Sequence, residues 1–393
     1  MKYSVPTNWQ DELIDGLMPA EGSELYGKLN NDVIGGGRAS ALLPFVSEKT
    51  ARRHINIAHQ KGFRFNYLLN ATCLGNSRYL ESHGNKIKRL LNWLVSAGVD
   101  AVTVSSSSMV NLVRKYAPGL DIYVSVQENI NNEFQIKHWD EIGVDKITLS
   151  VLDLNRNFAL LRKIKGKTRC DLQLIANLKC LLGCHAYHCH GNLNAHSSQS
   201  GHRLKGYLID YYTLKCNYIR FRNPEEFIKS PWIRPEDVHY YEEIGIHWLK
   251  LVGREMESGK IQQIFKAYKD RRYDGNLLDL FPGTEKKLVD FKKVARHFRY
   301  FFRPQHVNIL KLSQVRNIFK EDGIYIDNRS LDGFLEYFWF EKCNLICGAQ
   351  CEYCKKVTQK AIVIKQEYLK ERIKNSETFL NSLINGSLFD GYC

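Results

Sequence analysis

The chain has 393 residues, a formal net charge of +14, 44% hydrophobic residues and 25% charged residues. This composition excludes a globally disordered chain, and the length suffices for one large barrel or two ordinary domains. The first residues lack an export signal and no apolar run approaches the roughly 18 residues of a membrane span, so we expect a cytoplasmic protein without such a span. The positive charge favours an anionic partner, whether RNA, DNA, a phosphorylated small molecule or an acidic peptide.

Short apolar runs alternate with amphipathic stretches from residue 25 to residue 253. The runs predict eight strands, near residues 24–36 and at 65–70, 101–105, 122–126, 146–150, 172–177, 218–221 and 248–252. Helices are expected at 51–60, 87–95, 109–116 and 237–244, because apolar residues recur there at helical spacing. This rhythm predicts an α/β fold, a (β/α)8 TIM-like barrel, with an open doubly wound sheet as the alternative.

The pattern changes beyond residue 253. Residues 255–272 read as a helix, a basic and aromatic stretch covers 286–304, and a further helix is expected at 366–383. We therefore expect two parts. Residues 1–272 would form the barrel with a mid-chain iron–sulfur site, and residues 273–393 would form a cysteine-rich C-terminal appendage with a second, four-cysteine metal site.

The first group of cysteines lies mid-chain, at Cys180, Cys184 and Cys189, with Cys216 further on. Clustered cysteines in a reducing compartment usually hold metal, and thiolates suit iron–sulfur clusters and zinc. The group begins at the end of a predicted strand, where barrel enzymes place their active sites, so we expect a catalytic [4Fe-4S] cluster. Its fourth ligand would be Cys189, His190 or none. A Cys/His zinc site is the alternative, because five histidines crowd this segment.

The second group is Cys343, Cys347, Cys351 and Cys354, spaced as Cys-x3-Cys-x3-Cys-x2-Cys. Four thiolates this close would fold around one further [4Fe-4S] cluster or one zinc ion. The last three cysteines also spell a radical-SAM triplet. We reject that interpretation because the triplet stands near the end of the chain and Cys343 would occupy the open iron. A second cluster here would pass electrons or organise the tail.

Polar residues that follow the predicted strands are active-site candidates, because barrels and open sheets bind ligands at the carboxyl ends of their strands. We expect cations to hold an anionic substrate through charge-assisted hydrogen bonds and amides to orient it. The substrate-binding candidates are Arg38, Arg222 and Arg254, and the catalytic candidates are Asn70, Asn177, His190 and Lys250, with Asn192 as a further orienting amide. The run Gly35-Gly36-Gly37 would cradle an anion with its amides or simply form a tight loop.

Five short motifs occur in a fixed order along the predicted barrel. They are residues 35–38 (Gly-Gly-Gly-Arg), residues 65–70 (Phe-Asn-Tyr-Leu-Leu-Asn), Asn177-x2-Cys180-x3-Cys184-x5-His190-x-Asn192, residues 233–237 (Ile-Arg-Pro-Glu-Asp) and Lys250-Leu-Val-Gly253-Arg254. Together they resemble peptidase family U32, the collagenase-like group. The resemblance spans about residues 25 to 254.

The resemblance implies a barrel that carries an oxygen-sensitive [4Fe-4S] cluster, with Cys180, Cys184 and Cys216 matching the cluster cysteines. The fourth cysteine of the family would fall near residues 233–234, where this chain has none, so Cys189 and an open iron are the alternatives. It further implies oxygen-independent hydroxylation of RNA bases or of a ubiquinone precursor, or work in peptide natural-product pathways, rather than proteolysis.

We therefore expect an iron–sulfur enzyme that performs an oxygen-independent redox modification of RNA or a peptide, hydroxylation-like or by sulfur or radical chemistry. An electron donor or partner protein would serve it. One alternative is a zinc-containing nucleic-acid-binding protein without catalysis. The other is a true peptidase, although the sequence holds neither Gly-x-Ser-x-Gly nor His-Glu-x-x-His.

Overall fold

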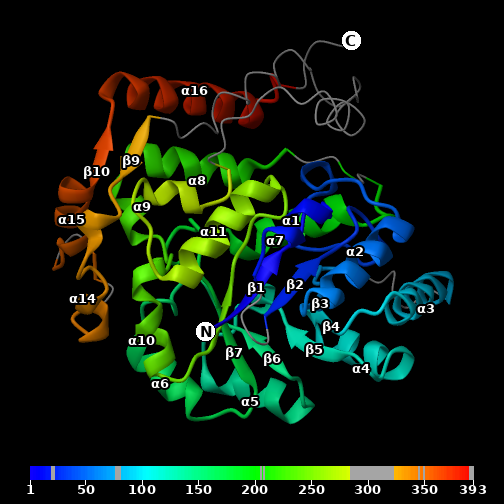
Figure 1. Ribbon diagram of the computed structural model, residues 1–393. Helices are drawn as coiled ribbons and strands as arrows, with labels where there is room; N and C mark the ends of the chain where they lie inside the picture. The colour runs from blue at the N-terminus through cyan, green and yellow to red at the C-terminus, as the bar shows by residue number, and fades with distance from the viewer. Residues whose placement is uncertain are drawn as a thin grey trace.

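Eight parallel strands form a closed barrel with helices around it (Figure 1). The computed structural model describes residues 1–18, 23–75, 81–203, 206, 209–283, 323–343, 346–347 and 350–388. The strands are β1 (Lys2–Pro6), β2 (Glu24–Gly27), β3 (Arg64–Leu69), β4 (Ala101–Val104), β5 (Asp121–Val124), β6 (Lys146–Thr148), β7 (Asp171–Ile175) and β8 (Trp248–Lys250). β1 closes the barrel against β8, with Ser4 opposite Lys250. The predicted (β/α)8 TIM-like barrel is confirmed.

Most helices lie between consecutive strands and cover the outside of the barrel. They are α1 (Asp11–Asp15), α2 (Glu48–Gln60), α3 (Glu81–Ser96), α4 (Ser107–Tyr116), α5 (Glu133–Ile142), α6 (Phe158–Lys165), α7 (Tyr187–Ser198), α8 (Tyr211–Arg222), α9 (Glu225–Lys229), α10 (Val238–Glu243) and α11 (Ser258–Asp270). Ser47, Ser106 and Asn132 fix the starts of α2, α4 and α5. Each accepts a hydrogen bond from the backbone N–H three residues on, which satisfies a group that the first helical turn leaves open.

Two sequence predictions about strands were wrong. Residues 218–221 belong to α8, in which Leu214 is buried against α16 (Gln366–Ile384). The prediction failed because a stretch of four residues with three apolar or aromatic side chains does not distinguish a strand from one face of a helix. β1 was not predicted because its interior residue Ser4 is polar, and a strand buried on both faces is expected as a continuous apolar run. The two errors offset one another, so the number of strands came out right.

The C-terminal appendage packs against the barrel. Its elements are η5 (Leu277–Leu280), β9 (Ile324–Ile326), η7 (Arg329–Leu331), α14 (Glu336–Trp339), α15 (Tyr353–Ala361), β10 (Ile362–Ile364) and α16. β9 pairs antiparallel with β10, and α16 runs along α8 (Figure 1). Arg234 Nη1 of the barrel donates to the Asn328 carbonyl at 2.7 Å and to Asp332 Oδ1 at 3.0 Å. The predicted boundary at residue 272 stays a prediction, and the basic stretch 286–304 lies outside the described residues.

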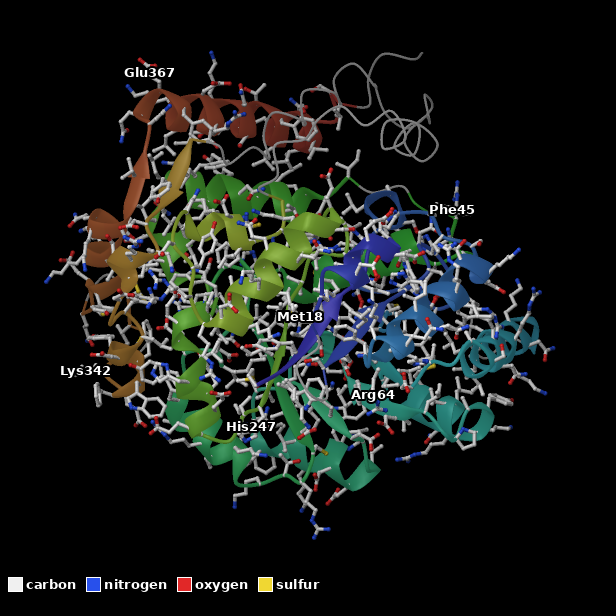
Figure 2. The ribbon with its side chains drawn as sticks, viewed as in Figure 1. Met18, Phe45, Arg64, His247, Lys342 and Glu367 are labelled. Atoms are coloured by element: carbon white, nitrogen blue, oxygen red, sulfur yellow. The ribbon has the colours of Figure 1, made fainter. Side chains whose placement is uncertain are left out.

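The two ends of the barrel differ in what covers them. Figure 2 shows Arg64, the first residue of β3, and His247, just before β8, at the lower end of the barrel, whereas Glu367 of α16 lies at the opposite end. The carboxyl ends of the strands therefore face the side on which α16 lies, and we call this end of the barrel the mouth. Within the described ranges, no helix is both long and apolar enough to cross a membrane.

Candidate active site at the barrel mouth

The barrel interior below the mouth is polar and carries one buried ion pair. Lys146 Nζ of β6 lies 2.9 Å from Glu24 Oε2 of β2, and neither side chain is more than 2% exposed. Ser4 Oγ donates to Glu24 Oε1 at 2.5 Å, and Asn66 Nδ2 donates to the same oxygen at 3.2 Å. Burial raises the pKa of Glu24, but Lys146 and the hydrogen bond from Ser4 outweigh burial and lower it overall.

Lys250, the last residue of β8, lies above this pair. Its side chain is 8% exposed, and Nζ stands 4.0 Å from the centroid of the Tyr26 ring. Burial lowers the pKa of Lys250 to about 7; Glu24 opposes this shift, and the charges of Lys146 and Arg254 add to it. The amine is thus poised between its charged and neutral forms at neutral pH.

Arg254 adds a second buried cation to the mouth. It is 8% exposed, and its Nη1 is buried without a hydrogen-bond partner among the described residues. Burial lowers the pKa of Arg254; Tyr26 opposes the shift and the neighbouring Arg38 adds to it. Arg38 itself pairs loosely with Glu255, at 3.5 Å between Nη2 and Oε1. Buried donors normally have partners, so this arrangement suits an anionic ligand.

The glycine run after β2 closes over the mouth. Gly35 N donates to Asp32 Oδ1 at 2.7 Å, Gly36 N to Ser198 Oγ at 2.8 Å, and Gly37 N to Asn70 Oδ1 at 3.4 Å. A Cβ on Gly36 would lie only 2.8 Å from Asn70 Oδ1, so the close approach requires glycine. These amides already donate within the protein, which makes the run a loop closure rather than an open anion cradle. Asn70 is held in the mouth, as predicted, by this bond and by donation to Ser125 Oγ at 3.2 Å.

Three of the mid-chain cysteines gather beside the mouth. Cys180 and Cys184 follow β7 and pack against the apolar cluster at the ends of β6 and β7, and Cys216 comes from α8. Burial raises the pKa of Cys180 to about 12; the nearby Cys216 and Cys184 thiols add to the shift, while Arg220 and Arg38 oppose it. Bringing such thiols to the thiolate form would take a strong positive charge, which a metal supplies.

These three thiols fit an iron–sulfur cluster in type and in neighbourhood. They lie near one another beside the mouth, and Arg220 stands near enough to Cys180 and Cys184 to favour their thiolates, with Arg38 acting on Cys180 as well. Among the described residues, no three Cys, His, Asp or Glu side chains already form a metal-binding arrangement.

The contacts of Cys189 and His190 do not identify either residue as the fourth ligand of the mid-chain cluster. Cys189 is exposed on α7 and hydrogen-bonds Tyr212. His190 Nε2 lies 3.0 Å from Asp210 Oδ2, and Thr213 Oγ1 donates to the same oxygen at 2.6 Å. Burial raises the pKa of Asp210, but its bonds to His190 and Thr213 lower it overall. His190 thus ties α7 to the start of α8, and its catalytic role stays a prediction.

Two further amides serve the framework of the site. Asn177 Nδ2 donates to the Val252 carbonyl at 3.1 Å and to the Leu280 carbonyl at 2.9 Å, and its Oδ1 accepts from Val252 N at 2.7 Å. It therefore fastens the ends of β7 and β8 to η5. Asn192 Oδ1 accepts from Thr72 Oγ1 at 2.6 Å, which links α7 to the loop after β3.

Arg222 lies elsewhere than predicted. It was expected at the end of a strand, but it stands exposed at the end of α8, where Nη1 donates to Tyr218 Oη at 3.1 Å. Tyr218 in turn donates to Glu377 of α16 at 2.6 Å. Arg222 therefore belongs to the contact between α8 and α16.

The sequence interpretation missed two residues of the site. Glu128 follows β5 on η3 (Val126–Glu128), and burial raises the pKa of its carboxyl to about 7. Arg220 of α8 is buried and donates to the Lys179 carbonyl at 2.7 Å, beside Cys180. The position of Glu128 directly after a strand was an available signal. That of Arg220 was not, because its segment was predicted to be a strand.

Comparison with known proteins finds relatives that match most of this chain and others that match only one segment of it. The profile of peptidase family U32 matches residues 38–297. The uncharacterized protease MJ1657 of Methanocaldococcus jannaschii is 30% identical over 334 residues, 85% of this chain and 87% of that protein. The tRNA hydroxylation protein P of Escherichia coli is 32% identical over 99 residues, only 24% of this chain and 20% of that protein. The solved U32 peptidase Mk0906 overlays with a TM-score of 0.47 at 18% identity, over 64% of this chain and 92% of that one.

Proposed function

Because the chain belongs to peptidase family U32, we propose that it is an iron–sulfur enzyme that carries out an oxygen-independent, hydroxylation-like modification of RNA. The segment shared with a tRNA hydroxylation protein supports an RNA substrate, although it covers only 20% of that protein. The net charge of +14 supports a polyanion in the same way. A modified peptide is the second substrate class, since acidic peptides also match this charge.

The observation that carries the proposal is the unpartnered guanidinium of Arg254. A buried Nη1 without an acceptor is costly, and a phosphate or another anion of the substrate would satisfy it. Arg38 and Lys250 stand beside it and add positive charge. The anion would thus be held at the rim on which Cys180 also lies, because Arg38 acts on both Arg254 and Cys180.

The cofactor of the proposal is a [4Fe-4S] cluster held by Cys180, Cys184 and Cys216. When bound, it would supply one-electron redox chemistry and, with three cysteine ligands, an open iron. The chain's own residues have separate tasks. Arg254 and Arg38 hold the anion, Asn70 orients the substrate under the glycine loop, and Lys250 gives up or takes a proton at Nζ.

A hydrolytic function is the alternative that the family name suggests. One Thr–His–Asp chain has the order of a hydrolase triad: Thr7 Oγ1 lies 2.7 Å from His54 Nε2, and His54 Nδ1 lies 3.1 Å from Asp11 Oδ1. However, Thr7 is 1% exposed, His54 is 0% exposed, and the Thr7 hydroxyl accepts a bond from Trp9 N. A nucleophile sealed in this way cannot reach a peptide bond, so these residues support the fold around β1.

The test compares RNA from cells that lack the gene with RNA from cells that carry defined variants. Wild type should restore one modified nucleoside detectable by mass spectrometry, and Cys180→Ala and Arg254→Gln should not. Cys170→Ser is the matched control, because Cys170 precedes β7 at the opposite end of the barrel and serine keeps its hydrogen-bonding group.

Two results would overturn the proposal. Zinc alone in a colourless protein that binds RNA without changing its nucleosides would favour a binding protein. Cleavage of denatured collagen that survives Cys180→Ala but is lost in Thr7→Val would favour a peptidase.

A further inference from the structure

A cavity of about 340 Å³ lies between the barrel and the appendage. The appendage lines it with Cys343, Cys347 and Cys354. The barrel lines it with Arg156 and with Leu182, which stands between Cys180 and Cys184 in the chain. Most of the barrel's share of the lining comes from residues 153–159, and Leu182 brings the loop that carries the mid-chain cysteines to the edge of the same cavity.

The four appendage cysteines form one neighbourhood. Cys347 and Cys351 meet in an isolated bridge of parallel backbone, although they are only four residues apart. Cys354 lies within electrostatic reach of both Cys347 and Cys343. The hydroxyl of Tyr337 lies 3.5 Å from Cys351 Sγ. Cys343, Cys347 and Cys354 therefore line the cavity, and Cys351 is joined to them through its bridge with Cys347; among the described residues these thiols do not already form a metal-binding arrangement, so binding a cluster would draw them together.

Arg156 supplies positive charge at the cavity wall. Its guanidinium lies 4.4 Å from the Trp232 ring centroid and 4.8 Å from the Phe334 ring centroid, and Nη1 donates to the Ile228 carbonyl at 2.6 Å. These contacts hold the group in place without a carboxylate partner. Its Nε is buried and unpartnered among the described residues, an observation independent of the cysteines that points to a missing acceptor.

We propose that Cys343, Cys347, Cys351 and Cys354 bind a second [4Fe-4S] cluster in this cavity, with Arg156 as its counter-charge. The cavity of about 340 Å³ has room for a cubane with its inorganic sulfides beside Arg156; a single zinc ion, about 2.3 Å from each sulfur, is the alternative that metal analysis distinguishes. The cluster is an electron relay: electrons that the substrate gives up at the mid-chain centre during its oxidation pass one at a time, across the wall at Leu182, to this centre and from it to an oxidised one-electron carrier protein, which is reduced, with no bond formed or broken at the appendage cluster. The relay, but not the metal site, rests on the proposed function.

The first experiment counts iron, acid-labile sulfide and zinc in anaerobically prepared full-length protein. Wild type should hold about eight iron and eight sulfide, and Cys347→Ser should hold about four of each. Cys347 is exposed, so its replacement leaves the fold intact, and Cys351→Ser provides a second variant that should lose the same four irons. Cys170→Ser should match wild type.

The outcomes separate this proposal from the proposed function. Unchanged iron in both appendage variants, or loss of about one zinc with no iron, would overturn the second cluster. Loss of about four iron in Cys347→Ser, with no iron lost in Cys180→Ala, would support the second cluster while the mid-chain assignment fails.

A second experiment tests the counter-charge and the relay by electron paramagnetic resonance of the dithionite-reduced protein. Wild type should give a broadened signal from two interacting clusters, and Cys347→Ser a simple signal from one. Arg156→Gln should lower the reduction potential of the appendage cluster, because the reduced cluster is more negative and loses its neighbouring cation, and Arg156→Lys should restore part of the shift. Equal potentials in wild type and Arg156→Gln, or a wild-type spectrum that is the plain sum of two isolated clusters, would overturn these roles.

Discussion

Two pairs of buried charged groups in the barrel, one in its interior and one at its mouth, differ in whether a carboxylate accompanies the cation. In the interior, Lys146 and Glu24 are no more than 2% exposed and meet at 2.9 Å. At the mouth, Lys250 and Arg254 are each 8% exposed, and neither makes an ion pair within the described part of the chain. The burial is similar, but Lys146 has a carboxylate partner, as does Lys28 after β2, which pairs with Asp32, whereas Lys250 and Arg254 have none among the described residues.

The difference separates a structural charge from a functional one. A buried ion pair with satisfied hydrogen bonds is costly to break but roughly neutral to replace as a whole, so Lys146 and Glu24 belong to the fold. A buried cation without a partner lowers stability, and the fold retains it only where a ligand supplies the missing charge. Substitutions at the two places should therefore act on different quantities.

The largest expected effect is on stability in the interior. Lys146→Met leaves Glu24 buried without its partner and should lower the free energy of unfolding by about 3–5 kcal/mol, measured by urea unfolding at pH 7. Lys250→Met, a matched control at the mouth, removes an unpaired charge and should leave stability unchanged or raise it. Equal destabilisation by both variants would contradict the distinction between the two places.

The next effect is on ligand binding at the mouth. Arg254→Gln removes a charge-assisted donor and should weaken the binding of a short RNA oligonucleotide about 10–100-fold, equivalent to about 1.5–3 kcal/mol, without loss of folding stability. Isothermal titration at fixed salt measures the change. Arg222→Gln is the control, because Arg222 is exposed on α8 and should alter affinity only slightly. A larger loss from Arg222→Gln than from Arg254→Gln would move the binding site to the face formed by α8 and α16.

Much of this mouth was predictable from the sequence. The alternation of strands and helices predicts the barrel, although one of its eight predicted strands was wrong and β1 was missed, and the rule that function lies at strand ends selects Lys250, Arg254 and the Cys180–Cys184 loop. Those residues lie at the end of a strand or within the loop that follows one, so their placement depends mainly on local pattern. The same rule would have found Glu128, but the positive net charge directed the prediction towards cations.

What could not be predicted depends on contacts between distant segments. Lys146 and Glu24 are 122 residues apart, and neither sequence environment indicates that the two side chains meet inside the barrel. Cys216 was placed beside a strand because the apolar residues of α8 were interpreted with the wrong period. The engagement of Asn177 with Leu280 likewise requires the appendage, whose packing no local pattern encodes.

The pH dependence of RNA binding would test the role of Lys250 as an unpaired cation of the mouth. Its folded pKa is lowered to about 7 from 10.5, so the protonated amine that attracts an anion is lost as pH rises through 7, and RNA affinity should fall severalfold between pH 6 and pH 8. Lys250→Arg should flatten this dependence because arginine stays charged. The unfolded chain binds more protons between pH 7 and 10.5, so this residue makes stability rise with pH there. An affinity that rises above pH 7 in wild type alone would instead assign Lys250 to proton abstraction.

The smallest expected effect is a change in folding stability on replacing Glu128. This residue extends the comparison of buried cations to a buried acid. Burial raises its folded pKa to about 7 from 4.5, so the folded protein binds more protons than the unfolded chain in this window, and stability is lost as pH rises through it. Glu128→Gln should therefore raise the free energy of unfolding by about 1 kcal/mol at pH 8, because water screens part of the charge, and should have little effect at pH 4.5. Glu141→Gln, at an exposed carboxyl of α5, is the matched control and should show no such pH dependence. If the two variants behave alike, the Glu128 carboxyl is solvated and plays no part in the chemistry. If they differ as expected, the carboxyl ends of the strands carry an acid that is about half protonated near pH 7 as well as an amine that is half neutral there, and both are available for proton transfer.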